Sequence, residues 1–423
     1  MSSHTPAEAP RGPVGLMIDV RFGGMFWGKF LSSGALWAHS IVAVIVVFEA
    51  TGSALTVGIV TGAMALPQLL LSPLSGTWAD RGDAARQMIV GRLVCAVASG
   101  GLATGLWWRP DAGERELTIV VVASALLLGF GFLIGGPAMQ SMIPLVIRPG
   151  ELPAAMALNT APAMAGRIVG PTWGAFSVIH LGPALTMAVA AALQLTFALI
   201  LVLIRLPRPS KRTDVDYSVR GGLRYVRRDR VMLLALMAAA ATGFGSEPFI
   251  TLAPATADAL GAGTAFVGLL ATSFGIGAAG GLLTITLLSR RLDHAWSTSS
   301  GIWLMFMGLA GTALAAGEIV SLVSYGVAGF GFSWGMTGVS IVIQARAPGH
   351  LRGRVMALWT MGFVGARPVA AAFSGLVAEA TSVRTAYATV AGLLVLAGVM
   401  CSPGRLRGPA PCDAGSESSG FRA

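Results

Sequence analysis

Long apolar stretches separated by short polar segments run through almost the entire chain. Windows of about 20 mainly apolar residues can cross a hydrocarbon core of about 30 Å as helices. In the first half such windows cover 26–49, 55–76, 88–108, 117–140, 152–179 and 183–204. In the second half they cover 231–256, 264–288, 296–316, 319–343, 352–379 and 384–401. The pattern predicts an all-α integral membrane protein with 12 transmembrane helices in two six-helix halves.

The composition agrees with a chain that lies mostly in lipid. Hydrophobic residues make up 54% and charged residues 11% of the 423 residues, whereas about a quarter of the residues of a soluble protein are charged. The mean hydropathy is +0.73. These values exclude an ordinary soluble protein.

Basic residues are distributed unevenly between the two sides of the predicted bundle. Cytoplasmic loops carry an excess of Lys and Arg, and placing both termini in the cytoplasm puts nearly all of these residues there. That side then holds the basic central loop with Arg11, Arg21, Lys29, Arg81, Arg86, Arg92, Arg148, Arg290, Arg291, Arg346, Arg352, Arg354, Arg405 and Arg407. Only Arg109, Arg115 and Arg384 fall outside. We therefore expect a multi-pass protein of the inner (cytoplasmic) membrane with both termini in the cytoplasm.

The net charge of +10 follows from this topology. Because the basic residues are spread over many short loops and form no single face, we expect no nucleic-acid partner. We expect contacts between the inner-face arginines and anionic membrane lipids. Cys95, Cys401 and Cys412 show neither CxxC nor Cys/His spacing, so we expect no metal, and we expect no cofactor.

The predicted boundaries divide the chain into five parts. These are a cytoplasmic tail at 1–25, a first bundle at 26–204, a basic cytoplasmic linker at 205–230, a second bundle at 231–401 and a disordered tail at 402–423. Within the linker, SVRGGLRYVRRDR is compatible with a short amphipathic helix that turns Leu223, Tyr225 and Val226 to lipid. A solvated basic loop is an equal alternative.

The two halves contain an internal repeat. MALNTAPAMAGR from Met156 and MALWTMGFVGAR from Met356 share Met, Ala, Leu and Thr in register, and each ends in an arginine at the same offset, Arg167 and Arg367. Two such halves with one substrate site between them, near the midplane, are typical of the major facilitator superfamily. The repeat therefore predicts a major facilitator fold.

The segment GTWADRGDAAR, from Gly76 to Arg86, lies between the second and third predicted helices. It resembles the loop signature of that superfamily, Gly-x-x-x-Asp-Arg followed by basic residues. The resemblance implies a cytoplasmic latch that stabilises the outward-open state, formed by Gly76, Asp80 and Arg81, while Arg81 and Arg86 hold the loop inside. The second half has Arg290 in place of Asp80, so we expect its latch to be degenerate.

The fifth predicted helix contains GRIVGPTWG. It resembles the Gly-x-x-x-Gly-Pro-x-x-Gly pattern of superfamily antiporters through Gly166, Gly170, Pro171 and Gly174. Small residues on one face allow close helix packing, and proline removes a backbone hydrogen bond. An antiporter motif and generic helix packing are both compatible with it.

A longer stretch, GGPAMQSMIPLVIRPGELPAAMALNTAPAMAGRIVGPTWG, together with GLRYVRRDR and LRGRVMALWTMGF, resembles the enterobactin-exporter-like branch of the superfamily. The resemblance implies proton-driven export of a siderophore, antibiotic or other amphipathic compound. Such exporters often carry an acidic residue midway along the first helix, where this chain has Ala35 and, one turn on, His39. The usual proton carrier is therefore missing.

Ionisable residues inside the membrane are expected to face the bundle interior or water. Arg167 and Arg367 should flank a central cavity, either to attract an anionic substrate or to tie helices together. Glu247 is the first candidate for proton coupling, against the alternative of a solvated rim carboxylate. His39 is the second candidate, against the alternative of a packing residue.

Three amides in predicted helices, Gln68, Asn159 and Gln194, are candidates for substrate contacts in the cavity. No enzyme motif and no phosphate-binding loop occurs in the sequence, so an ion gradient is the expected energy source. We expect a monomer whose partners are a small-molecule substrate and protons. Uptake by symport and a non-transporting receptor or scaffold are the alternatives to export.

Overall fold

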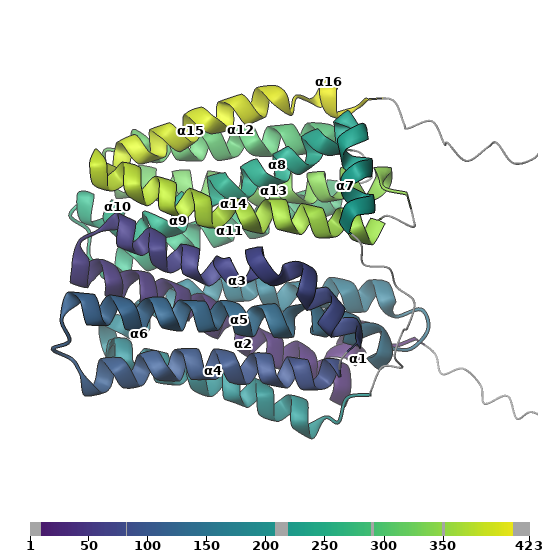
Figure 1. The fold of residues 1–423 in the computed structure, drawn as a ribbon, viewed down its shortest axis with the longest axis horizontal. Helices are drawn as coiled ribbons and strands as arrows, with labels where there is room; N and C mark the ends of the chain where they lie inside the picture. The colour runs from purple at the N-terminus through teal and green to yellow at the C-terminus, as the bar shows by residue number, and fades with distance from the viewer. Residues whose placement is uncertain (1–9, 82, 208–218, 289–291, 349–351, 409–423) are drawn as a thin grey trace, which may run out of the picture.

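The computed structural model describes residues 10–81, 83–207, 219–288, 292–348 and 352–408. All regular structure within these residues is α-helical (Figure 1). The first bundle contains α1 Pro13–Ile18, α2 Val20–Thr51, α3 Ala54–Arg81, α4 Ala84–Trp108, α5 Glu114–Val146 and α6 Leu152–Leu203. The second contains α7 Val219–Arg228, α8 Arg230–Ser246, α9 Pro248–Thr251, α10 Ala253–Ala259, α11 Thr264–Leu288, α12 His294–Ala313, α13 Glu318–Arg346, α14 Arg352–Ala380, α15 Val383–Met400 and α16 Pro403–Leu406.

The helices account for twelve spans. Within the described ranges, ten helices are long and apolar enough to cross a membrane. One of them, α6, has 52 residues and is broken at Gly182 (φ 79°, ψ 162°), so it supplies two spans. Glycine adopts this positive φ readily, and Pro183 follows it. The 20-residue α12 supplies the remaining span, and the predicted twelve-helix membrane fold is confirmed.

The first span begins at Val20 rather than at residue 26. Asp19 caps it, because its Oδ1 accepts hydrogen bonds from the backbone N–H groups of Arg21 (2.9 Å) and Phe22 (2.7 Å). The short helix α1 precedes this cap and buries Leu16 completely. Part of the segment that the sequence predicts as a tail is therefore folded against the bundle.

The two halves lie side by side, α1–α6 in purple to blue and α7–α16 in teal to yellow (Figure 1). Between them α3 packs against α14, and α6 packs against α11. A Cβ atom added to Gly58 of α3 would lie 2.5 Å from the carbonyl oxygen of Ala371. One added to Gly375 would lie 2.7 Å from that of Ala54. Glycine therefore lets the two backbones meet.

We call the end of the bundle that carries α1, α7 and α16 the basal end, and the end that carries α10 the distal end (Figure 1). Hydrogen bonds between side chains of the two halves join, among the described residues, Thr61 to Thr251 (3.0 Å), Ser53 to Glu379 (3.0 Å), Thr264 to Glu49 (2.8 Å) and Thr172 to Thr272. All of them lie in the distal half of the bundle. The two halves are therefore held together toward the distal end.

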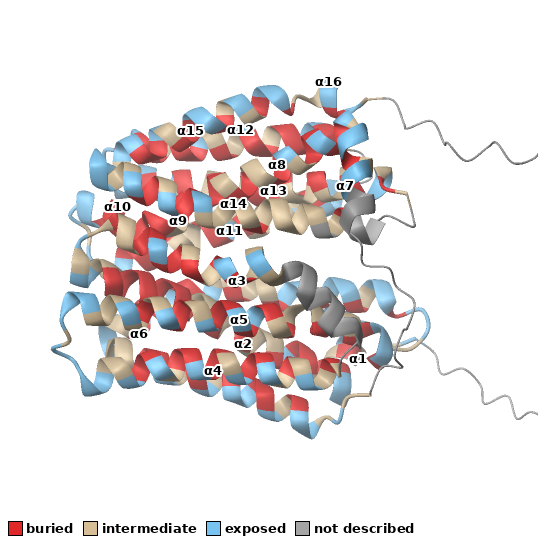
Figure 2. Cartoon of the chain, in the orientation of Figure 1, coloured by how far each residue is buried: buried red, intermediate tan, exposed pale blue. Residues whose placement is uncertain are grey.

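Apolar side chains remain exposed on the outward faces of the helices. Figure 2 shows buried residues concentrated where helices face one another and exposed residues along the outer surfaces and ends. Leu287 is 73% exposed, and Val97 and Leu203 are also exposed. A surface of this kind is stable in contact with lipid chains.

The second part of the linker is helical, which confirms the amphipathic-helix alternative for α7. Its predicted orientation is wrong. Val226 is 2% exposed, and the Tyr225 hydroxyl donates a hydrogen bond to the Arg346 carbonyl (3.1 Å). Both side chains face protein because α7 packs against α14, and only Leu223 remains exposed.

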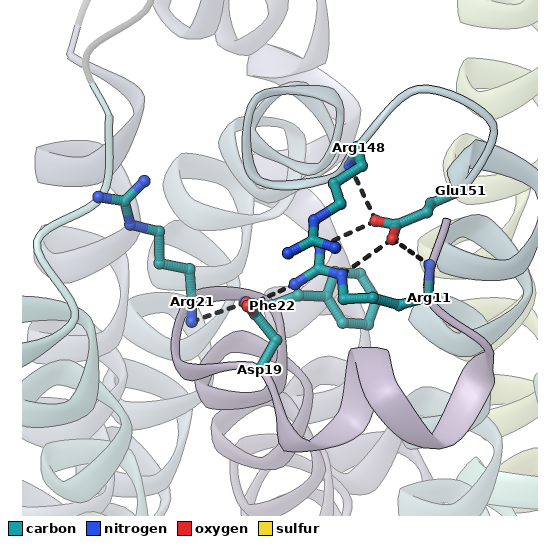
Figure 3. A network of polar contacts seen from close by, with 6 residues as sticks. All are labelled: Arg11, Asp19, Arg21, Phe22, Arg148 and Glu151. Atoms are coloured by element: carbon teal, nitrogen blue, oxygen red, sulfur yellow. Dashed lines mark hydrogen bonds and ion pairs between the residues drawn. The ribbon is translucent and has the colours of Figure 1, made fainter. Parts of the chain in front are cut away.

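A charged network fixes the first residues to the connection between α5 and α6 (Figure 3). The Glu151 carboxylate, which is 1% exposed, accepts hydrogen bonds from the Arg11 backbone N–H (2.6 Å), Nε (2.9 Å) and Nη2 (2.8 Å) and from the Arg148 N–H (2.8 Å). The hydrogen bond from the Arg11 side chain lowers the pKa of Glu151 to about 2. We call these residues the basal clamp.

Candidate functional site

Three charged residues meet near the middle of the bundle. Arg167 lies 15 residues from the start of α6 and Arg367 lies 15 residues from the start of α14, or about 22 Å at 1.5 Å per residue. Glu247 follows the last residue of α8. Arg167 is near enough to interact electrostatically with both other residues. The interior therefore carries charge where charge is costly.

Glu247 and Arg367 form an ion pair. The Arg367 Nε donates to the Glu247 Oε2 at 2.7 Å, and the side chains are 24% and 1% exposed, respectively. The Glu247 Oε1 is buried and has no hydrogen-bond partner in the described part of the chain. One carboxylate oxygen is therefore bound, and the other has no partner among the described residues.

The helix is broken at this carboxylate. Pro248 begins α9 directly after Glu247, and proline supplies no backbone N–H. The Tyr387 hydroxyl donates to the Pro248 carbonyl (3.3 Å) and is hydrogen-bonded to Tyr325 (2.7 Å) and Thr256 (3.1 Å). These buried hydroxyls fix the break and, with it, the position of Glu247.

Arg167 lies in an aromatic cage formed by both halves. Its guanidinium carbon is 5.1 Å from the ring centre of Trp37 on α2, 5.0 Å from Phe274 on α11 and 4.3 Å from Phe332 on α13. Rings at these distances attract a cation. Across the described ranges no carboxylate pairs with Arg167. The cage thus holds a cation between the halves without a direct ion-pair partner among the described residues.

The glycine motif of the fifth span packs α6 against α2. A Cβ atom added to Gly170 would lie 2.6 Å from the Cβ of Trp37, and one added to Gly174 would lie 3.0 Å from the Cα of Ala38. One added to Gly166 would lie 2.6 Å from the Cβ of Ser33. Pro171 is buried within the same helix. The motif therefore positions Trp37 against Arg167.

His39 is hydrogen-bonded within the first half. It is 1% exposed, and its Nδ1 and Nε2 are hydrogen-bonded to Ser99 (2.9 Å) and Ser124 (3.4 Å). Both ring nitrogens have partners inside the first half, as expected of a packing histidine. A coupling role for His39 stays a prediction.

Two of the three candidate amides have partners within the first half. The Asn159 Oδ1 accepts a hydrogen bond from the Lys29 Nζ at 2.8 Å. The completely buried Gln194 exchanges two hydrogen bonds with Ser32, at 2.7 and 3.2 Å. Gln68 is half-buried on α3. Their roles in substrate contact stay predictions.

Lys29 and Arg92, which the sequence predicts on the cytoplasmic side, lie within helices and not in loops. Both lie inside membrane helices, and Arg92 is only 8% exposed. The Arg92 Nη1 donates to the Ser32 Oγ, and its guanidinium lies 5.8 Å from the ring centre of Phe197. The sequence contains one sign of this polar cluster. Lys29 and Ser32 are three residues apart, and residues at i and i+3 lie on the same face of a helix.

The loop signature is described only in part. Gly76, Asp80 and Arg81 lie on α3, and their side chains fall outside the described residues, as does the whole of Arg290. The Arg86 side chain is 76% exposed and lies 3.5 Å from the Asp83 carboxylate. The latch role therefore stays a prediction. Among the described residues, no group of three or more His, Cys, Asp or Glu could hold a metal ion.

Comparison with known proteins identifies a family and relatives that match this chain. The family model described as transmembrane secretion effector matches residues 17–419. The enterobactin exporter EntS of Shigella boydii serotype 18 (strain CDC 3083-94 / BS512) is 27% identical over 392 residues, which cover 89% of each chain. EntS of Escherichia coli O139:H28 (strain E24377A / ETEC) is 26% identical with the same coverage.

Solved structures show the same fold at low sequence identity. A D-xylose–proton symporter superposes with a TM-score of 0.73 at 15% identity, covering 90% of this chain and 97% of that chain. A bacterial homologue of the iron transporter ferroportin, in an inward-facing state, gives 0.72 at 16% identity with the same coverage. The chain therefore belongs to the transmembrane secretion effector family, in the enterobactin-exporter-like branch of the major facilitator superfamily of transporters.

Proposed function

We propose that this protein exports a small amphipathic organic molecule, such as a siderophore, antibiotic or drug-like metabolite, by proton antiport. Relatives whose alignments cover 89% of this chain are named as enterobactin exporters. The basal end faces the cytoplasm in this proposal, in agreement with the excess of arginine there. Both halves of the site lie within one chain, so a monomer suffices.

The Glu247–Arg367 pair is the observation that carries the proposal. Protonation of Glu247 removes its charge and weakens its 2.7 Å hydrogen bond from Arg367. The freed guanidinium can then move away from Glu247, while loss of the proton restores the pair. The break between α8 and α9 gives the seventh span a place to bend when this happens.

Alternating access completes the cycle. The cross-half contacts of the distal half, including the buried hydrogen bond between Thr61 and Thr251, support a state that is closed outward and loads substrate from the cytoplasm. Rocking of the halves would break these contacts to release it. The latch of Gly76, Asp80 and Arg81 would stabilise the opposite, outward-open state.

The test is proton-driven efflux of a fluorescent amphipathic probe from proteoliposomes that contain the full chain. Glu247→Gln should lose pH-driven efflux and keep probe exchange in the absence of a gradient, because only the proton site is removed. Glu318→Gln removes an exposed carboxylate of the distal end and should leave both activities unchanged.

Undiminished pH-driven efflux in Glu247→Gln removes this residue from the mechanism. His39→Gln serves as the second arm, and loss of gradient-driven efflux only in that variant moves coupling to His39. Probe accumulation that follows protons in the same direction would establish symport in place of export. Absence of exchange under every condition would favour a receptor or scaffold.

A further inference from the structure

The first half contains a pair of cations, the buried Arg92 and the partly buried Lys29, that proton coupling does not use. Lys29 of α2 and Arg92 of α4 lie 9 and 8 residues from the basal starts of their helices, or about 12 to 14 Å at 1.5 Å per residue. They are near enough for Arg92 to repel Lys29 electrostatically. They therefore share one level of the bundle, between the basal end and the cage around Arg167.

Polar groups organise the pair. The Lys29 Nζ donates to the carbonyl oxygen (2.6 Å) and the Oδ1 (2.8 Å) of Asn159 on α6. The Arg92 guanidinium donates to Ser32, whose hydroxyl in turn donates to Gln194 (2.7 Å). Four membrane spans, α2, α4 and the two parts of α6, thus hold the two cations in place. We call these five residues the basal cation site.

Among the described residues, no carboxylate is paired with the two cations. Neither Lys29 nor Arg92 forms an ion pair within the ranges that the structure describes. An arginine has five N–H donors and an ammonium group has three, so both cations retain donors after the contacts above. Unneutralised cations inside a membrane protein are costly and mark functional sites. An anion that reaches this level would take up the remaining donors and neutralise the charge.

We infer that the basal cation site binds an oxyanion of the transported molecule, a carboxylate or a group of similar charge, as that molecule enters from the basal end. This inference rests on the proposed export function and narrows its substrate class to organic anions. Arg167, about 10 Å deeper at 1.5 Å per residue, offers the next cation along the path. The phosphate of an anionic lipid has the same chemistry and is distinguished by the experiment.

The test measures binding of benzoate to the full chain in a neutral detergent at constant ionic strength. Benzoate should raise the midpoint of thermal unfolding in a saturable manner, and its uncharged counterpart benzyl alcohol should not. Lys29→Gln and Arg92→Gln should each weaken the apparent benzoate affinity by about tenfold or more, because a buried charge partner is lost. Arg92→Lys should retain part of the binding.

Arg21→Gln is the matched control, since it removes an exposed arginine at the same end and should leave benzoate affinity unchanged. If Arg92→Gln does not fold, Lys29→Gln decides the question. Unchanged affinity in the Gln variants, or no response of the unmodified protein to benzoate, overturns the inference.

A second experiment distinguishes an oxyanion of the transported molecule from the phosphate of a lipid. Nanodiscs of phosphatidylcholine are compared with nanodiscs that also contain phosphatidylglycerol. If the Gln variants lose stabilisation by phosphatidylglycerol and keep benzoate binding, the site holds a lipid headgroup and the inference fails. Benzoate binding requires neither a proton gradient nor transport, so this outcome is independent of the Glu247→Gln result.

Discussion

The basal clamp makes a quantitative prediction about stability and pH. Glu151→Gln removes the charge that accepts two hydrogen bonds from the Arg11 side chain, at 2.9 and 2.8 Å. The pKa of Glu151 is lowered to about 2, first of all by hydrogen bonding to the Arg11 side chain, against about 4.3 in an unfolded chain. At about 1.4 kcal/mol per pKa unit, this difference corresponds to roughly 3 kcal/mol at neutral pH.

The sign follows from the depressed pKa. A carboxylate whose pKa is lower in the folded state stabilises the protein above its unfolded pKa, and this stabilisation is lost as pH falls from about 4.3 to about 2. The side chains of Glu151 and Arg11 are 0% and 18% exposed, respectively. The pair nevertheless lies at the end of the bundle beside solvent, and screening there makes roughly 3 kcal/mol an upper figure.

The assay is thermal unfolding of the purified protein in detergent between pH 3 and pH 7. Glu151→Gln should lower the midpoint by several degrees at pH 7, and the difference from the unmodified protein should shrink as pH falls below about 4. Asp111→Asn, at an exposed carboxylate of the distal end, is the matched control. Equal midpoints at pH 7, or a difference that stays constant down to pH 3, would refute the reasoning.

Two further predictions concern packing and the helix break. Gly170→Ala should destabilise the protein by about 1–3 kcal/mol, because the new Cβ would lie 2.6 Å from the Cβ of Trp37. Gly34→Ala, whose added Cβ has nothing within 4 Å, is its control, and equal unfolding midpoints for the two variants would contradict the packing argument. Tyr387→Phe should cost about 1–3 kcal/mol, since the hydrogen bonds to Pro248, Tyr325 and Thr256 are lost within a buried cluster. It should also slow gradient-driven efflux, and full activity with unchanged stability would show that these hydroxyls do not fix the break.

The spans were predictable because lipid imposes one rule on every membrane helix. About 20 consecutive apolar residues are needed to cross the hydrocarbon core, and this requirement is visible without any tertiary information. The earlier start of α2 also had a local signal, since Asp19 followed by an apolar run is a typical helix cap. Such features depend on neighbours in the sequence, and a linear scan can detect them.

The charged site depended on contacts between distant residues. Glu247 and Arg367 are 120 positions apart. The hydropathy at one of these positions gives no information about its contact with the other residue. Lys29 and Arg92 are assigned to the cytoplasmic side by the distribution of Lys and Arg along the chain, which does not report that Arg92 is buried. Burial of a side chain depends on the direction in which it leaves the helix, and the count of positive residues ignores that direction.

The two arginines of the internal repeat differ in their partners. Arg167 and Arg367 occupy equal positions in α6 and α14, yet Arg367 has a carboxylate partner and Arg167 has three aromatic rings. A carboxylate can bind and release a proton, whereas aromatic rings leave the charge of Arg167 available to an anion. The second half is therefore suited to proton coupling, and the first half, with Lys29 and Arg92, is suited to holding an anionic substrate.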